Sequence, residues 1–224
     1  MTREARPDDI ATVLLDARAG DLRRLAEEPT PYDAMFGSVS RLFDLLQTHH
    51  VDFVLVGGLA VLSYVGGRNT RDIDLIMAAG DLERLPEFHV ESRDKDFARA
   101  TFEGVQIDIL LTTNPLFELV RSDYSVRRDF SGRSIPCATV EGLVLLKLFA
   151  LPSLYRQGDF GRVNVYEGDI AALVEGYRPN MEPLMRELEL HILPTDLAQI
   201  RKILADVESR VERFRASQGE STGR

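Results

Sequence analysis

Three aspartates have the residue type and the spacing for chemistry with a metal ion. Asp72 and Asp74 flank one isoleucine in the segment RDIDLIM, and Asp108 lies in the segment VQIDILL. Side chains two residues apart on a strand point to one face, so a strand over 71–77 would present Asp72 and Asp74 together. Neighbouring carboxylates repel one another unless a cation neutralises them, and Mg²⁺ (or Mn²⁺) prefers such oxygen ligands. The spacing therefore predicts a divalent metal site.

Asp108 would join this site if its strand lay beside the strand of the other two aspartates. Within 105–111 only Gln106 and Asp108 are polar, and they alternate with apolar residues that would pack inward. Three carboxylates suit a two-metal phosphoryl-transfer site, in which one ion activates the attacking oxygen and the other steadies the triphosphate. The alternative is that Asp72 and Asp74 belong only to the solvated face of a half-exposed sheet.

A glycine pair precedes the aspartates. Gly57 and Gly58 end the apolar run 53–56, which is expected to form a short buried strand. Because glycine has no side chain, such a turn would let a phosphate approach the backbone closely. A Gly-Gly pair is also common in ordinary turns, so the pair is informative only together with the aspartates.

A short polar segment lies between the glycine pair and Asp72. It contains Arg68, Thr70 and Arg71. A guanidinium beside a nucleotide site can hold phosphate or pair with an aspartate. These three residues are therefore candidates for nucleotide binding, and a salt-bridged loop is the alternative.

The order of these motifs resembles the nucleotidyltransferase superfamily, which has a polymerase-β-like fold. The shared order is a strand, Gly-Gly, a short helix, Asp-x-Asp on the next strand and a lone aspartate on a later strand. The resemblance implies that Gly57 and Gly58 lie against the triphosphate, that Asp72 and Asp74 bind metal, and that Asp108 binds metal or acts as general base. The position of Gly58 is often serine in that superfamily, so here a backbone N–H would have to contact the phosphate.

Lys147 and Asp169 extend the resemblance into the second half of the chain. Lys147 lies among leucines in TVEGLVLLKLFALPSLYR, which is expected to be a helix, and Asp169 is expected near the start of the next helix. A lysine that snorkels to water is the alternative reading. The arrangement is similar to abortive-infection type toxins of toxin–antitoxin systems, and the resemblance covers about residues 50–175. It implies that Lys147 contacts the nucleotide phosphates and that Asp169 completes the site.

The resemblance implies transfer of a nucleoside monophosphate from an NTP to an acceptor hydroxyl. RNA, with the 3′ end of tRNA as the favoured acceptor, and a cognate antitoxin are the expected partners. Residues 121–162 carry seven Arg or Lys against four acids, which favours RNA, whereas the net charge of −9 argues against indiscriminate nucleic-acid binding. The alternatives are a small-molecule (antibiotic) nucleotidyltransferase and a non-catalytic nucleotide-binding or antitoxin-type partner protein.

The expected fold is α+β, with a small mixed sheet flanked by helices and a helical C-terminal half. We expect a helical extension over 1–30, the nucleotidyltransferase core over 31–137, a helical region over 138–214 and a disordered tail over 215–224. Cys137 is the single cysteine, and the sequence shows neither an apolar leader nor a run long enough to span a bilayer. These features predict a cytoplasmic protein with no membrane contact.

Overall fold

The computed structural model describes residues 31–66, 70 and 72–221. The chain divides into two compact units, with the boundary between Thr139 and Val140. The first unit contains a mixed sheet and the second is helical, so the expected α+β class is confirmed. The extension expected over 1–30 lies outside the described residues.

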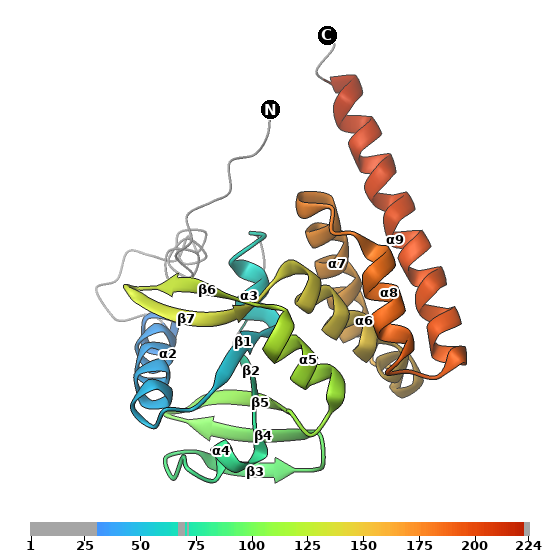
Figure 1. The fold of residues 1–224 in the computed structure, drawn as a ribbon. Coiled ribbons are helices and arrows are strands. Elements are labelled where there is room, and N and C mark those ends of the chain that lie inside the picture. Colours follow the sequence, from blue (N-terminus) through green and yellow to red (C-terminus); the bar gives the residue numbers. More distant parts are fainter. Residues whose placement is uncertain (1–30, 67–69, 71, 222–224) are drawn as a thin grey trace. The chain divides into compact units, whose positions relative to one another are not determined.

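A mixed β-sheet forms the centre of the first unit (Figure 1). Among the described residues it has seven strands, in the order β3-β4-β5-β2-β1-β7-β6. The strands are β1 (Phe53–Val56), β2 (Ile73–Met77), β3 (His89–Arg93), β4 (Phe97–Phe102), β5 (Val105–Leu111), β6 (Ser125–Phe130) and β7 (Arg133–Ala138). The parallel pairs β2–β5 and β1–β7 lie inside the sheet, and antiparallel hairpins form both edges.

Strands β1 and β5 have the bounds expected from the sequence, but β2 begins at Ile73, two residues after the expected start at residue 71. β1 ends at Val56, which pairs with Asp74 in the antiparallel register. Because Gly57 then starts a helix, β1 offers no partner to the residues before Asp74, and the pairing of β2 with β5 begins at Ile73. The expectation that Asp72 and Asp74 share one strand is therefore wrong, and Asp72 lies just before β2.

Four helices accompany the sheet in the described part of the first unit. They are α2 (Pro31–Thr48), α3 (Gly57–Leu62), α4 (Ala79–Leu82) and α5 (Pro115–Asp123). Phe43 of α2 stacks on Phe53 with ring centroids 5.8 Å apart and meets Phe130 edge-on at 5.0 Å. These aromatic contacts fix α2 against β1 and β6, since aromatic pairs add favourable energy beyond the area that they bury.

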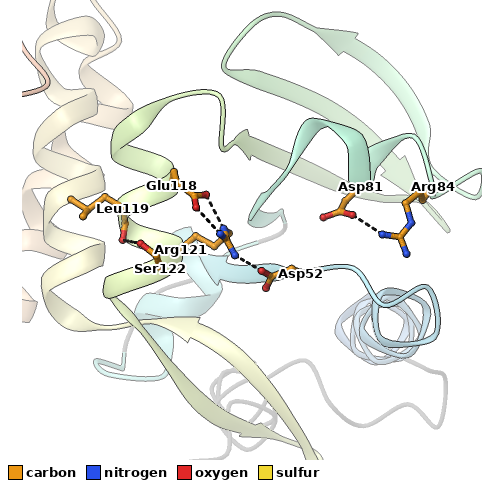
Figure 2. A network of polar contacts seen from close by, with 7 residues as sticks. All are labelled: Asp52, Asp81, Arg84, Glu118, Leu119, Arg121 and Ser122. Carbon is orange, nitrogen blue, oxygen red and sulfur yellow. Dashed lines mark hydrogen bonds and ion pairs between the residues drawn. The ribbon is translucent and has the colours of Figure 1, made fainter.

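Ion pairs attach α5 to the segment that enters β1 (Figure 2). Arg121 donates to both carboxylate oxygens of Glu118, at 2.9 and 2.6 Å, and to the carboxylate of Asp52. The Arg121 guanidinium lowers the pKa of Glu118 below its usual range, chiefly through this hydrogen bond. A nearby pair, Arg84 with Asp81 at 2.8 Å, holds the end of α4. The Arg121–Asp52 pair thus anchors the residue that precedes β1, the strand before the glycine pair.

The second unit consists of α6 (Val140–Gln157), α7 (Phe160–Tyr177), α8 (Met181–Glu189) and α9 (Pro194–Ser221). Their apolar faces form a common core. Its fully buried residues include Leu148, Leu151, Ile170, Leu173, Leu188, Ile200 and Val207. None of the helices in the described part of the chain is both long enough and apolar enough to cross a membrane.

Two helix boundaries in this unit differ from expectation. Asp169 lies in the middle of α7, because that helix begins at Phe160, where the Asp159 carboxylate accepts from the Arg162 N–H at 3.1 Å. The tail expected to be disordered over 215–224 is helical as far as Ser221. Arg215 explains part of this extension, since it donates to the carbonyl oxygens of Val174 and Glu175 at 3.3 and 2.7 Å.

Candidate active site

Asp74 and Asp108 lie side by side on the sheet. The parallel register of β2 and β5 pairs Asp74 with Asp108, between the pairs Ile73–Ile107 and Leu75–Ile109. In β5 the residues alternate between fully buried and half-buried, and Asp108 is on the half-buried face. The expectation that the two strands are neighbours is confirmed. Two carboxylates therefore occupy equivalent positions on one face of the sheet.

Gly57 leaves the space that the Asp74 carboxylate occupies. A Cβ atom at this position would lie 1.8 Å from Asp74 Oδ2, and the residue has a φ of +63°. The N–H of Gly58 donates to the same oxygen at 3.3 Å. Gly57 is thus required by Asp74 itself, which sequence reasoning missed, while Gly58 contributes its backbone N–H. Its contact with a triphosphate stays a prediction.

Thr70 holds Asp72 just before β2. The Thr70 side chain is buried, and its hydroxyl lies 3.3 Å from both the Asp72 carbonyl oxygen and Asp72 Oδ1. Such local hydrogen bonds from a threonine fix the backbone of a turn. Thr70 therefore positions Asp72, and its expected role in binding nucleotide stays a prediction. Arg68 and Arg71 lie outside the described residues.

Arg99 and Gln106 hold both oxygens of the Asp108 carboxylate. Arg99 Nε lies 2.7 Å from Oδ1 and its Nη2 lies 3.2 Å from Oδ2, while Gln106 Nε2 is 3.2 Å from each oxygen. The pKa of Arg99 is raised, first by the hydrogen bond to Asp108 and then by its charge, with smaller contributions from Glu91 and Asp72. Asp108 is therefore one half of a bidentate ion pair.

Sequence reasoning missed Arg99, although a signal for it exists. Glu103 and Gly104 both have positive φ and form the two-residue turn between β4 and β5. Such a turn sets the register of a hairpin. Counting back from it places Arg99 opposite Asp108, as the structure shows.

The expected three-carboxylate metal site is not assembled in the described residues. No group of three His, Cys, Asp or Glu side chains in 31–66, 70 and 72–221 is arranged to hold a metal ion. The chemistry of the donor set, carboxylates at Asp72, Asp74 and Asp108, still suits a hard divalent cation. The Asp108 carboxylate is paired with the Arg99 guanidinium, whose charge is also positive.

Lys147 and Asp169 form a buried ion pair within the second unit. Lys147 Nζ lies 2.7 Å from Asp169 Oδ2, and the two side chains are only 5% and 10% exposed. The ammonium also lies 4.3 Å from the centroid of the Tyr166 ring. The snorkelling alternative is wrong, since the lysine does not reach water. Tyr166 was missed, although it is one turn before Asp169 and so shares its helix face.

A second polar cluster lies on the same unit. Glu167 accepts from the Tyr155 hydroxyl at 2.5 Å and from Arg210 Nη2 at 3.1 Å. These residues line a pocket of about 380 Å³ together with Asp206 and Arg213. The bond to Glu167 raises the pKa of Tyr155 to about 12. The lining carries both charges, so it does not point to one class of ligand.

Solved structures provide the comparison with known proteins. No family model matches this chain, and no curated protein matches it. An antigenic nucleotidyltransferase-like protein from Paracoccidioides brasiliensis superposes with a TM-score of 0.56 at 19% identity, over 80% of this chain and 93% of that one.

Two structures of the antibiotic-resistance factor ANT(2″)-Ia are more distant. Its solution structure gives a TM-score of 0.45 at 15% identity, over 81% of this chain and 97% of that one. Its complex with adenylyl-2″-tobramycin gives a TM-score of 0.47 at 12% identity, over 78% of this chain and 97% of that one. The chain has a nucleotidyltransferase-like fold, as its likeness to the Paracoccidioides brasiliensis protein shows. The pairing of the aspartate-bearing strands β2 and β5 agrees with this fold.

Proposed function

We propose that the protein is an enzyme that transfers a nucleoside monophosphate from an NTP to an acceptor hydroxyl, with Mg²⁺ (or Mn²⁺) as its cofactor. One observation carries this proposal: Asp74 and Asp108 lie in register on neighbouring strands, with Gly57 and Gly58 packed against Asp74. The nucleotidyltransferase-like fold supports it.

The residues of the first unit have distinct proposed roles. Asp72 and Asp74 would hold the metal ion, which would neutralise charge on the triphosphate. Thr70 keeps Asp72 in place through its hydroxyl. Asp108 serves as a further ligand or as the general base that accepts the proton of the acceptor hydroxyl. For the second role its carboxylate must exchange a hydrogen bond now made to Arg99 or Gln106.

Lys147 is proposed, on the resemblance, to contact the nucleotide phosphates, with Asp169 as its partner. The ammonium is already bonded to a carboxylate and stacked on Tyr166. A phosphate would therefore compete with Asp169 for it. Until that exchange occurs, the pair joins α6 to α7.

The acceptor that we propose is RNA, with the 3′ hydroxyl of tRNA as the favoured site and a toxin-like role held in check by an antitoxin. The support is the basic excess over 121–162. Many of these side chains pair with carboxylates, as Arg133 does with Asp44 at 2.6 Å and Arg156 with Asp196 at 2.8 Å. Arg127, on the edge strand β6, is exposed, and its Nη1 donates to the Ser134 carbonyl oxygen at 3.0 Å; we propose it as one contact for an RNA phosphate.

A small cationic acceptor such as an aminoglycoside is the second candidate. It is favoured by this same pairing, which removes much of the local positive charge, and by the net charge of −9. A cation would be attracted to such a protein, whereas a polyanion would be repelled by it.

A transfer assay tests the proposal and separates the two acceptors. The full chain is incubated with each labelled NTP, Mg²⁺ or Mn²⁺, and either total tRNA or an aminoglycoside panel. Label is expected in tRNA with wild type and none with Asp72→Asn/Asp74→Asn. Label in an aminoglycoside alone would move the proposal to the second candidate. Equal blanks for both proteins with every acceptor would contradict the enzyme.

Two further measurements test the remaining partners. A thermal shift with NTP and Mg²⁺ that disappears in Asp74→Asn supports a nucleotide enzyme, because a ligand that binds only the folded state stabilises it. A shift that is unchanged in Asp74→Asn would favour the non-catalytic binding protein. For the toxin role, expression is expected to arrest growth, and Asp74→Asn should relieve the arrest. Asp74→Asn is preferable to Lys147→Ala, since the latter leaves the buried Asp169 without its ammonium.

A further inference from the structure

We propose that Arg99 is a resident counter-cation of Asp108 that competes with the divalent metal ion for this carboxylate. The inference rests on the proposed function, because it concerns how the metal site of that reaction is assembled. It assigns a role to a residue outside the Asp72, Asp74 and Asp108 set. Arg99 would be a positioning residue that sets how much metal the protein needs.

The hydrogen bonds of Asp108 leave little room for a metal in the present arrangement. An ionised carboxylate offers about four lone-pair sites on its two oxygens. Arg99 uses one site on each oxygen, and the amide of Gln106 approaches both oxygens at 3.2 Å. A metal ion that binds Asp108 must therefore displace at least one of these two donors.

Arg99 is placed where it acts on more than one carboxylate. It lies directly opposite Asp108 on β4, and Asp108 lies directly opposite Asp74 on β2, so the three residues form a row across three neighbouring strands. The raised pKa of Arg99 has a contribution from the charge of Asp72 as well. The guanidinium thus supplies positive charge to the same carboxylates that a divalent ion would neutralise.

The ion pair is also exposed enough to open. The side chains of Arg99 and Asp108 are 41% and 22% exposed, so water can solvate either group after separation. Most ion pairs at this degree of exposure contribute at most about 1 kcal/mol to stability, and the bidentate geometry places this pair at the upper end of that range. A strongly bound divalent ion can therefore replace the guanidinium at small cost, whereas separating a fully buried pair carries a large desolvation cost.

Direct measurement of metal binding tests the inference without relying on catalysis. Mn²⁺ is titrated into the full chain without nucleotide. Binding is measured by calorimetry and by the electron paramagnetic resonance signal of free Mn²⁺. Arg99→Gln is expected to bind Mn²⁺ about tenfold more tightly than wild type, the factor that corresponds to one lost competing interaction. Arg93→Gln is the matched control, since Arg93 lies on the adjacent strand β3 and its exposed ion pair is with Glu83, at the end of α4. The control should bind like wild type.

A second readout follows Arg99 itself. The ¹H–¹⁵N resonance of its Nε reports the bond to Asp108 and should shift as Mg²⁺ is added to wild type, in parallel with binding. In Asp108→Asn it should not respond to Mg²⁺. If Arg99→Gln were to fold poorly, Arg99→Lys keeps the charge but loses the bidentate geometry, and tighter Mn²⁺ binding is expected there too.

The outcomes separate this inference from the proposed function. Equal Mn²⁺ affinity of wild type, Arg99→Gln and Arg99→Lys, or an Nε resonance that ignores Mg²⁺, would overturn the competition while transfer activity could still be present. Mn²⁺ binding that persists unchanged in Asp72→Asn/Asp74→Asn, together with no transfer to any acceptor, would instead overturn the proposed function. Weaker Mn²⁺ binding in Arg99→Gln would also overturn the competition.

Discussion

The two units each contain a short ion pair at a predicted site residue, but the surroundings of the two pairs differ. Arg99–Asp108 lies on the sheet of the first unit and Lys147–Asp169 lies between two helices of the second, both with a closest contact of 2.7 Å. The sheet pair is partly exposed, whereas the helix pair is almost fully buried. The two pairs have the same closest N···O distance and differ in how far their side chains are buried.

The difference shows which pair can exchange partners. Breaking a buried pair leaves a charge without solvent, which is strongly destabilising, while breaking a partly exposed pair returns both groups to water. Tyr166 adds a further contact to the buried ammonium. We infer that the sheet pair can exchange partners at small cost, whereas the helix pair maintains structure unless a bound phosphate replaces Asp169 as the partner of Lys147. Lys147→Met and Arg99→Gln test this contrast directly, and Gly57→Ala and Tyr155→Phe test one further contact in each unit.

The largest effect is expected for Lys147→Met. It leaves Asp169 buried without its ammonium, so the free energy of unfolding should fall by about 3–5 kcal/mol. Urea denaturation measures this loss. Lys202→Met, at an exposed position of α9, should change stability by less than about 0.5 kcal/mol. A Lys147→Met variant as stable as wild type would contradict the structural role.

The next effect is expected for Gly57→Ala, beside the Asp74 carboxylate. Its Cβ would overlap Asp74, and we expect a loss of about 2–4 kcal/mol from overpacking together with the left-handed backbone. Gly132→Ala is the matched control, since its φ is +79° with no atom within 4 Å. The control should lose only about 1–2 kcal/mol, the backbone part. Equal losses in the two variants would show that Asp74 does not occupy this space.

A smaller effect is expected for the stability of Arg99→Gln. Because the pair is partly exposed, the free energy of unfolding should fall by no more than about 1 kcal/mol. The same urea denaturation applies. A loss as large as that of Lys147→Met would mean that the sheet pair is as fixed as the helix pair, and the contrast between the units would disappear.

A pH-dependent effect is expected for Tyr155, whose bond to Glu167 lies at intermediate burial. Its pKa is raised to about 12 in the folded protein, so the folded state holds this proton more tightly than the unfolded chain, where the pKa is about 10. The contribution to stability is present below pH 10 and is lost as pH rises through 12. The difference in unfolding free energy between wild type and Tyr155→Phe should therefore shrink over this range. A difference in unfolding free energy that stays constant over this pH range would show that the Tyr155–Glu167 bond does not contribute to stability in this way.

Much of the first unit could be predicted from the sequence because its signals are local. The period-two pattern of 105–111 fixes which face carries Asp108, and the apolar run 53–56 ends at glycine as a buried strand does. The start of β2 could not be predicted in this way, since it depends on the registers in which β2 pairs with β1 and with β5. The space that Gly57 leaves for Asp74 likewise depends on the register of two strands.

The second unit was harder to predict because its boundaries depend on capping and on distant contacts. Gly158, with a positive φ, and Asp159, which caps α7, were present as signals and fix the start of that helix. The burial of Lys147 required knowing that Asp169 and Tyr166 lie on the facing helix. Arg215, which binds carbonyl groups at the end of α7, extends α9 through a contact that no local pattern contains.

The parallel pairing of β1 with β7 has a consequence for how the protein is made. Leu55 pairs with Cys137, so β1, which is synthesised early, cannot form its pairing with β7 until late in synthesis. On a ribosome, β1 and β2 can pair early, but the other side of β1 stays open until β7 has been synthesised. Contacts this distant in sequence form slowly. We expect newly synthesised chains to need protection of the apolar β1 edge during this interval, and chains that stop before β7 to aggregate.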